Sequence, residues 1–417
     1  MFKKVLSLCL AVIMVAALGV SLASCGNSKS DFKLGVILLH DEASTYDLNF
    51  IEAVERAVEQ LGLKEDQVVF KKNIPESNEC YEAAADLVDE GCDVIFADSF
   101  GHEDYIIKAA KEFPEVQFCH ATGTKAHTEE LSNFHNAFAS IYEGRYLAGV
   151  AAGLKLNEMI DAGEIAAEEA KIGYVGAFTY AEVISGYTSF FLGARSMCPS
   201  ATMEVQFTGS WYNENEEKNA AIALMNNGCV LISQHADSMG APSACEERGV
   251  PNVSYNGSTI ASCENTFIIS SKIDWTPYIV NICQNTIDGK AIDTDWTGTI
   301  STGSVALTDV NTKAAAEGTQ AKIDEIKAKL VAGELHVFDT SKFTVTVVKE
   351  GDATKNVNAT VDADGHLTGY MADVDTDANF AGDTEVVKDG YFHESEFRSA
   401  PYFDIQIDGI TLLNAKF

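Results

Sequence analysis

Short apolar runs alternate with amphipathic segments along most of this chain. Residues 33–39 (KLGVILL) have the length of a buried strand, and residues 49–62 carry apolar side chains at helical spacing. The same order continues through strands at 67–72, 92–97 and 116–121 and helices at 78–91 and 105–113. A second series begins at residue 171, with strands at 171–177, 203–211, 229–233 and 251–258 and helices at 181–197, 213–228 and 234–249. Two such series predict an α/β protein with two parallel sheets, each covered by helices on both faces.

The segments between and after the two series suggest how the lobes are connected. Strand-like residues 133–140 and 266–273 are candidate crossings between the lobes, and a helix at 275–289 would return the chain to the first lobe. We therefore predict a first lobe from residues 33–138 with about 270–298, and a second lobe from 139–269 with about 299–339.

The pattern changes near residue 340. Residues 343–350, 356–370 and 401–414 favour β-strands joined by turns, so residues 340–417 are predicted to form a β-rich extension. An acidic stretch at 373–385 has acids at alternate positions, as calcium loops do, but Ala378 occupies the position that needs glycine. We predict no metal site and no cofactor.

The first 24 residues have the pattern of a secretory signal. Lys3 and Lys4 precede an apolar run that ends at LASC (Leu22–Cys25), which resembles a bacterial lipobox. We predict a lipoprotein signal peptide at 1–24, lipid on Cys25, a polar tether at 25–32, and an extracytoplasmic chain anchored to the bacterial membrane. The alternatives are an uncleaved membrane anchor, because the run is long enough to span a bilayer, and a simple secretion signal.

Charge and cysteine usage narrow the partners. The 417-residue chain has a formal net charge of −33, which argues against a nucleic-acid partner because phosphate contacts need basic surface. The cysteines beyond Cys25 are dispersed and form no CxxC pair, which favours small buried thiols over disulfides.

Four segments together resemble one family. They are residues 93–123 (DVIFADSFGHEDYIIKAAKEFPEVQFCHATG), 143–154 (EGRYLAGVAAGL), 209–228 (GSWYNENEEKNAAIALMNNG) and 274–289 (DWTPYIVNICQNTIDG). Their order and the lipobox are similar to the basic membrane protein family, whose members are extracytoplasmic solute-binding lipoproteins of ABC transporters, with purine nucleoside receptors among them. The resemblance covers roughly residues 33–310. It implies the two-lobed type I periplasmic-binding-protein fold, a ligand in the cleft between the lobes, and an ABC permease as partner.

Candidate ligand contacts come from the carboxyl ends of the predicted strands, where open α/β sheets bind ligands. The residues we select there are Tyr46, Asp47, Phe100, Gly101, Asp104, Phe178, Trp211, Asp237, Asn256 and Lys272. The same strand ends also carry Ser99, Tyr180, Tyr212, His235 and Ser271. Aromatic faces suit a flat base, and carboxylates and amides suit ribose hydroxyls and ring nitrogens.

Some of these residues have a competing structural explanation. Asp47 is a plausible N-cap of a helix beginning near Leu48, and Lys272 is selected only because of the family resemblance. Members of the family commonly have asparagine where this chain has Asp47, and aspartate where it has Asn256. These departures leave the ribose and base contacts open.

The first strand–helix turn, HDEASTYDLNF (40–50), lacks the glycines of a phosphate loop. A carboxylate in this turn would repel a nucleotide's phosphates, which favours a nucleoside over a nucleotide. Together with the purine nucleoside receptors of the family that the chain resembles, this predicts a purine nucleoside-like ligand. The alternatives are a sugar or another small solute on the same fold, and a surface sensory or structural lipoprotein without a transporter. His235 and Asp237 invite a catalytic interpretation, but the sequence has no GxSxG nucleophile motif, so we predict no enzyme.

Overall fold

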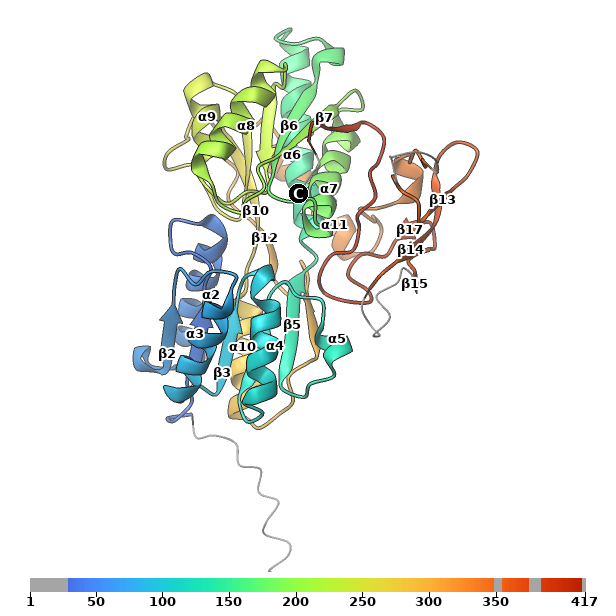
Figure 1. Ribbon diagram of the computed structural model, residues 1–417. Coiled ribbons are helices and arrows are strands. Elements are labelled where there is room, and N and C mark those ends of the chain that lie inside the picture. The colour runs from blue at the N-terminus through green and yellow to red at the C-terminus, as the bar shows by residue number, and fades with distance from the viewer. Residues whose placement is uncertain (1–28, 349–354, 375–383, 415–417) are drawn as a thin grey trace, which may run out of the picture.

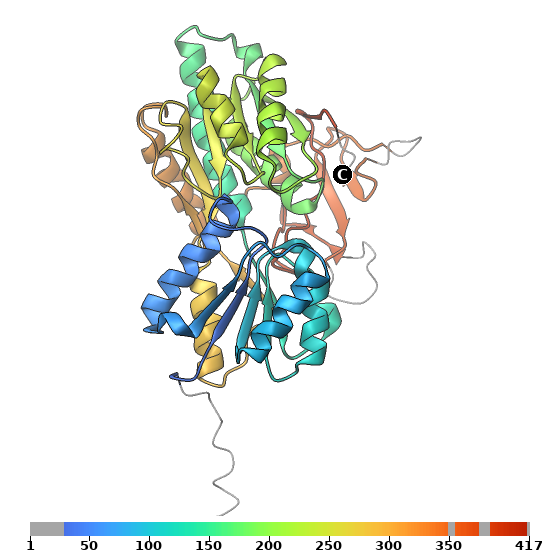
Figure 2. The ribbon, with the colours of Figure 1, turned by 60° about the vertical axis from the view of Figure 1, so that its left-hand side comes forward.

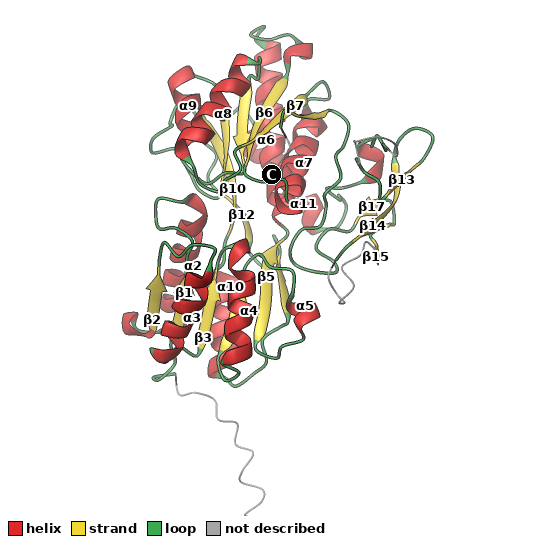
Figure 3. Cartoon of the chain, viewed as in Figure 1, coloured by secondary structure: helices red, strands yellow, loops and turns green. Residues whose placement is uncertain are grey.

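Two β-sheets flanked by helices make up most of the chain in the computed structural model (Figures 1 and 3). The structure describes residues 29–348, 355–374 and 384–414. The predicted signal peptide, Cys25 and most of the acidic stretch at 373–385 lie outside these residues. Within the described part, no helix is both long enough and apolar enough to cross a membrane.

The first lobe is built on a six-stranded sheet. Its strands are β1 (Leu34–Ile37), β2 (Val68–Lys71), β3 (Val94–Ala97), β4 (Gln117–His120), β5 (Phe134–Ala139) and β11 (Asp295–Gly298). Its helices are α2 (Thr45–Leu61), α3 (Asn78–Asp89), α4 (Glu103–Glu112), α5 (Ala126–Glu129) and α10 (Thr276–Ile287). The strands are all parallel in the order β11-β5-β4-β3-β1-β2.

Both faces of this first sheet are buried, which explains its continuous apolar strands. Ile37 and Ile95 pack with α3 and α4 in one apolar cluster, whereas Val36 and Phe96 pack on the other face with α2 and α10. The rings of Phe50 and Trp275 stack there at 4.6 Å between centroids.

The second lobe repeats the arrangement on a seven-stranded sheet. Its strands are β6 (Lys171–Gly176), β7 (Thr202–Phe207), β8 (Leu231–Gln234), β9 (Asn252–Tyr255), β10 (Phe267–Ile273), β12 (Val305–Leu307) and β18 (Ile410–Leu412). Its helices are α6 (Ile141–Asp161), α7 (Ala181–Met197), α8 (Glu214–Asn226), α9 (Gly240–Arg248) and α11 (Thr319–Val331). The order is β12-β10-β9-β8-β6-β7-β18, with β12 antiparallel to β10 and the other pairs parallel. The predicted α/β architecture with two parallel sheets is confirmed.

Helices α6 and α7 pack closely enough to exclude side chains at two glycines. A Cβ at Gly149 would lie 2.0 Å from the carbonyl oxygen of Phe190, and one at Gly193 would lie 2.0 Å from that of Tyr146. This close packing fixes α7, whose first turn carries Glu182 into the cleft described below.

The chain passes between the two sheets three times. Figure 2 shows the two lobes one above the other in a second view. The crossings are β5 to α6, β10 to α10, and β11 to β12. Backbone hydrogen bonds tie these crossings together, from Ser140 N to Gly298 O at 2.8 Å and from Asp274 N to Ser304 O at 2.7 Å.

The C-terminal extension contains β13 (Ala359–Val361), β14 (Leu367–Ala372), β15 (Thr384–Glu385), β16 (Val387–Lys388) and β17 (Tyr391–Phe392). Two predicted strands differ from the structure: residues 343–348 and 401–407 are extended or irregular rather than paired in a sheet. Their alternating apolar residues are nevertheless buried, as Phe343, Val345, Phe403 and Ile405 show. The alternating pattern therefore predicted correctly which side chains are buried, but it predicted the strand pairing only in part.

Two further sequence expectations concern the whole chain. The last strand, β18, pairs with β7 and so belongs to the second sheet rather than to a separate β unit. The eight cysteines of the described residues are buried free thiols, as predicted: Cys80, Cys92, Cys119, Cys198, Cys229, Cys245, Cys263 and Cys283.

Candidate ligand-binding site

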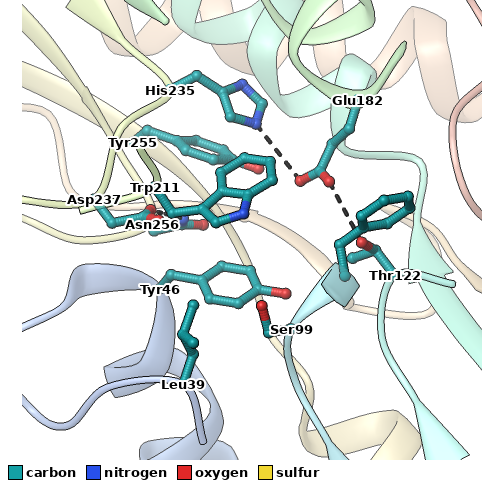
Figure 4. Close-up of a pocket in the computed structure, with 11 residues that line it drawn as sticks. Leu39, Tyr46, Ser99, Thr122, Glu182, Trp211, His235, Asp237, Tyr255 and Asn256 are labelled. Carbon is teal, nitrogen blue, oxygen red and sulfur yellow. Dashed lines mark hydrogen bonds and ion pairs between the residues drawn. The ribbon is translucent and has the colours of Figure 1, made fainter. Parts of the chain in front are cut away.

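A cavity lies between the lobes, at the carboxyl ends of the strands of both sheets (Figure 4). The empty space around its lining atoms, with the open solvent at its mouth included, is about 360 Å³. The first lobe contributes Leu39, Tyr46, Ser99, Phe100 and Thr122, and the second contributes Glu182, Trp211, His235, Asp237, Tyr255 and Asn256. Figure 4 shows Asp237 and Asn256 at one end of this cavity and Glu182 with Thr122 at the other.

Tyr46 enters the cavity from the first turn of α2. Ser44 is the N-cap of this helix, and its hydroxyl accepts a hydrogen bond from the backbone N–H of Asp47 at 3.2 Å. The Tyr46 hydroxyl donates to the carbonyl oxygen of Asp98 at 2.6 Å, and its ring packs edge-on against Phe50. One edge of the ring is therefore fixed by the first lobe while the remainder lines the cavity.

Asp47 does not line the cavity. It is fully buried beneath the turn, where it accepts a hydrogen bond from the His40 backbone N–H at 2.8 Å and lies 3.4 Å from His40 Nδ1. Burial alone would raise its pKa, but hydrogen bonds from His40 and Ser44 outweigh burial and lower the pKa. Its interpretation as the helix N-cap is wrong, because Ser44 occupies that position and the helix begins at Thr45.

The two lobes touch directly around the cavity. Thr45 donates to the carbonyl oxygen of Asp237 from both its backbone nitrogen, at 3.2 Å, and its hydroxyl, at 3.1 Å. Asn49 Nδ2 lies 3.5 Å from Asn256 Oδ1. The structure is therefore a closed arrangement of the lobes, with the start of α2 against the loops after β8 and β9.

Asp237 and Asn256 form the polar end of the cavity. Asn256 Nδ2 donates to Asp237 Oδ1 at 3.1 Å, and Asn256 has a left-handed backbone with φ of 62°. Burial, together with the nearby charge of Glu217, raises the pKa of Asp237 well above its usual range. None of the described residues that line the cavity is a lysine or an arginine.

Glu182 joins the lobes at the other end of the cavity. Its Oε2 accepts a hydrogen bond from the Thr122 hydroxyl at 3.4 Å, and its Oε1 lies 3.5 Å from His235 Nε2. Burial lowers the pKa of His235, although Glu182 opposes this shift. The other ring nitrogen, Nδ1, lies 3.3 Å from the Tyr174 hydroxyl, so both imidazole nitrogens have protein partners. At this end of the cavity the Glu182 carboxylate is therefore the acceptor that a ligand can use.

Arg145 supports the cavity from behind and is completely buried. Its NH2 donates to Tyr174 OH at 2.9 Å, to Ser233 Oγ at 3.1 Å and to the carbonyl of Gln234 at 3.2 Å. Its guanidinium also lies 5.0 Å from the centre of the Tyr255 ring, which lines the cavity. Arg145 therefore positions Tyr255 and the strand that leads to His235.

Aromatic side chains from both lobes surround the same space. Phe100 is 36% exposed, and its ring lies 5.3 Å from that of Tyr180 across the cleft. Phe178 does not line the cavity. It stacks on Tyr180 at 5.2 Å and meets Trp211 edge-on at 5.0 Å, so it supports the rings that face the cleft.

Half of the selected residues therefore line the cavity, namely Tyr46, Phe100, Trp211, Asp237 and Asn256. The others have identifiable local partners. The Gly101 N–H donates to Glu76 Oε1 at 2.8 Å, and a Cβ there would overlap the Glu76 side chain. The Asp104 carboxylate pairs with Lys125 at the surface. Lys272 lies 4.0 Å from Glu52 of α2, outside the cavity.

Sequence reasoning did not single out four lining residues: Leu39, Thr122, Glu182 and Tyr255. Leu39 and Tyr255 belong to strand-like segments whose side chains are expected in the hydrophobic core, so the sequence pattern does not mark them as cavity residues. Thr122 follows β4, whose carboxyl end could have been inspected like the others. Glu182 follows Tyr180 in the first helical turn after β6, where an acid is also expected simply to favour the helix dipole.

The chain is similar to known substrate-binding proteins of ABC transporters. The family model described as ABC transporter substrate-binding protein PnrA-like (Bmp) matches residues 35–340. A purine-binding protein of Brucella abortus is 28% identical over 351 residues, which span 82% of this chain and 95% of that protein. A putative ABC transporter glucose-binding protein of Haloferax volcanii is 36% identical over 186 residues, 45% of this chain and 44% of its own.

Solved structures show the same fold at low sequence identity. An ABC transporter solute-binding protein from Conexibacter woesei aligns with a TM-score of 0.59 at 20% identity, covering 73% of this chain and 98% of its own. One from Aeropyrum pernix aligns with a TM-score of 0.61 at 18% identity, covering 74% and 93%. The predicted two-lobed type I periplasmic-binding-protein fold is confirmed.

Proposed function

This chain belongs to the Bmp family of PnrA-like ABC transporter substrate-binding proteins, and from that premise we propose that it is a lipid-anchored receptor for a purine nucleoside-like ligand. Membership of this family establishes the general function of the chain. Its members are extracytoplasmic proteins that bind a small molecule and work with an ABC permease, and they are not enzymes.

The chemistry of the cavity carries the proposal. Tyr46, Trp211 and Tyr255 offer ring faces or edges, and stacking of a base on an aromatic side chain contributes roughly 1–3 kcal/mol. Asp237, Asn256 and Glu182 supply acceptors and a donor for ring nitrogens and hydroxyls. A flat, uncharged ligand rich in hydrogen-bonding groups fits this combination.

The charge of the cavity argues against a nucleotide. Glu182 and Asp237 are acidic, and no lysine or arginine among the described lining residues would neutralise a phosphate. Burying phosphate beside carboxylates without a cation is strongly unfavourable. The purine-binding relative supports the choice of a purine.

Ligand capture would work by closure of the two lobes. The cavity takes residues from both lobes, so a ligand that contacts both favours the closed arrangement over an open one. Closed lobes would then present a defined surface to the permease. No chemical change of the ligand is involved.

A sugar is the second candidate, because part of the chain is similar to a putative glucose-binding protein. Trp211 could stack on a sugar ring as on a base. Isothermal titration of a soluble chain starting at residue 26 separates the two. We expect saturable binding of adenosine or inosine and no heat with glucose or ribose; saturable sugar binding with no response to any purine would overturn the proposal.

The lipid anchor is part of the same proposal and rests on Leu22–Cys25. Cells expressing the full chain should incorporate labelled palmitate into it. A Cys25→Ala variant that still takes up label would exclude lipidation at this residue.

A further inference from the structure

The C-terminal extension lies beyond the part of the chain that the family model covers, which ends at residue 340. It is attached to both lobes (Figures 1 and 2). On the second lobe, β18 pairs with β7, and the Tyr142 hydroxyl of α6 donates to the carbonyl of Glu394 at 3.4 Å. On the first lobe, the Ser399 N–H donates to Asp295 Oδ2 of β11 at 2.8 Å.

These attachments create a second pocket beside the ligand cavity, which we call the side pocket. The first lobe lines it with Phe100, Thr122 and Thr124, the second with Thr179–Glu182 and Ile184, and the extension with Arg398, Ala400, Pro401 and Asp404. The empty space around its lining atoms, with open solvent included, is about 880 Å³. Phe100, Thr122 and Glu182 line both the side pocket and the ligand cavity.

Only a thin partition separates the two spaces. It consists of the Phe100–Tyr180 ring contact, with centroids 5.3 Å apart, and of the Thr122–Glu182 hydrogen bond. That hydrogen bond is long, at 3.4 Å, and therefore weak. A ligand group that offers better partners to Thr122 and Glu182 could replace it at little cost.

The two spaces differ in chemistry. The ligand cavity combines the rings of Tyr46, Trp211 and Tyr255 with polar groups at its ends, whereas the side pocket adds the hydroxyls of Thr124 and Thr179, the Asp404 carboxylate and the Arg398 guanidinium. The extension holds its polar groups in place: Arg398 donates to the carbonyls of Ala400 at 3.2 Å and Pro401 at 3.3 Å, and Asp404 accepts from the Tyr370 hydroxyl. Threonines and carboxylates on opposite walls suit a hydroxylated group.

We propose that the side pocket receives the ribose end of the ligand, while the base stays among the rings of the cavity. This inference rests on the proposed function. It gives the extension a direct role in ligand selection, because Arg398 and Asp404 form one wall of the compartment for the sugar. A free base would not use this compartment.

The test compares each nucleoside with its free base. Thr124 lines the side pocket but not the cavity, so Thr124→Trp fills the compartment without touching the base site. Thr360→Trp places the same ring on an exposed part of β13 and is the matched control. Titrations use adenosine with adenine and inosine with hypoxanthine, and melting curves establish that each variant folds.

We expect Thr124→Trp to weaken nucleoside binding at least ten-fold and base binding less than two-fold, with Thr360→Trp like the wild type. Arg398→Met alters the wall that the extension provides, and it should reduce the affinity for nucleosides more than the affinity for free bases. This second variant keeps the test decisive if Thr124→Trp does not fold. Equal losses for base and nucleoside, or no loss for either, would overturn the inference. A wild-type chain that binds no purine in either form would instead contradict the proposed function.

Discussion

At the residue scale, the first turn after β1 shows that two adjacent residues of one helix can have entirely different surroundings. The sequence predicts that Tyr46 and Asp47 both contact the ligand, yet Tyr46 lines the cavity and Asp47 is buried against His40. Adjacent helical residues point about 100° apart, so a helix that already begins at Thr45 cannot send both side chains into the cleft. The apolar pattern placed the helix start near Leu48 and did not reveal the Ser44 cap.

Tyr46 provides a direct test of the aromatic contact. Tyr46→Ala removes the ring, and we expect nucleoside binding to weaken by roughly 1–3 kcal/mol, the usual contribution of base stacking. Tyr46→Phe keeps the ring and loses only the hydrogen bond to the Asp98 carbonyl, so its affinity should stay close to wild type. Titration calorimetry of both variants checks this; similar losses in the two would show that the hydroxyl, and not the ring, matters.

Other site residues could not be found from the sequence, for a reason specific to each. Arg145 sits in a segment that carried the family resemblance, but only the folded structure shows that its hydrogen bonds reach the strands beneath His235 and Tyr255. Glu182 has contacts in both lobes, with Thr122 on one side and His235 on the other. Contacts of this kind depend on how the lobes close, which periodicity does not encode.

At the scale of elements, the predictable parts are those with strong local patterns. The buried strand at Leu34–Ile37 and the helix ending before Gly62 follow from apolar runs and a left-handed C-cap glycine. The extension was harder to predict from the sequence, because its buried apolar residues lie in segments without regular secondary structure, such as 343–348. Alternation predicts which side chains are buried, but not whether a hydrogen-bonded partner strand exists.

The extension also contains a buried acid whose titration can be tested. Glu394 Oε1 accepts from the Tyr402 N–H at 2.6 Å, and burial raises the pKa of Glu394 to about 8. Between pH 4.5 and 8 the folded state keeps the proton on Glu394, whereas the unfolded state has released it. The free energy of unfolding therefore falls as the pH rises through this range.

Glu394→Gln removes this penalty, because the amide resembles the protonated acid. We expect the variant to match wild type near pH 4.5 and to become more stable with rising pH, by up to about 1.4 kcal/mol per pH unit until about pH 8. Thermal melts across this range measure the gap, and the exposed Glu317→Gln variant serves as control. A gap that stays constant with pH would mean that Glu394 is already ionised in the folded chain.

At the scale of the whole molecule, the two-lobed order followed from two βα series in sequence, because neighbouring strands of each sheet are close along the chain. The exceptions are β11, which pairs with β5, and β18, which pairs with β7, because Asp295 and Asn136, and likewise Ile410 and Met203, are far apart in sequence. Such a pairing leaves no local signal. The same holds for the contact between Ser399 and Asp295, which attaches the extension to the first lobe.

A purine nucleoside in the cleft is the ligand that we propose for this protein. The most direct measurement is mass spectrometry of the small molecules released when the protein, purified without denaturation, is unfolded, with a parallel sample of the Trp211→Ala variant. We expect a purine nucleoside in near-stoichiometric amount from the wild type and much less from the variant. A sugar or another non-purine solute, released stoichiometrically from the wild type in place of a nucleoside, would contradict it.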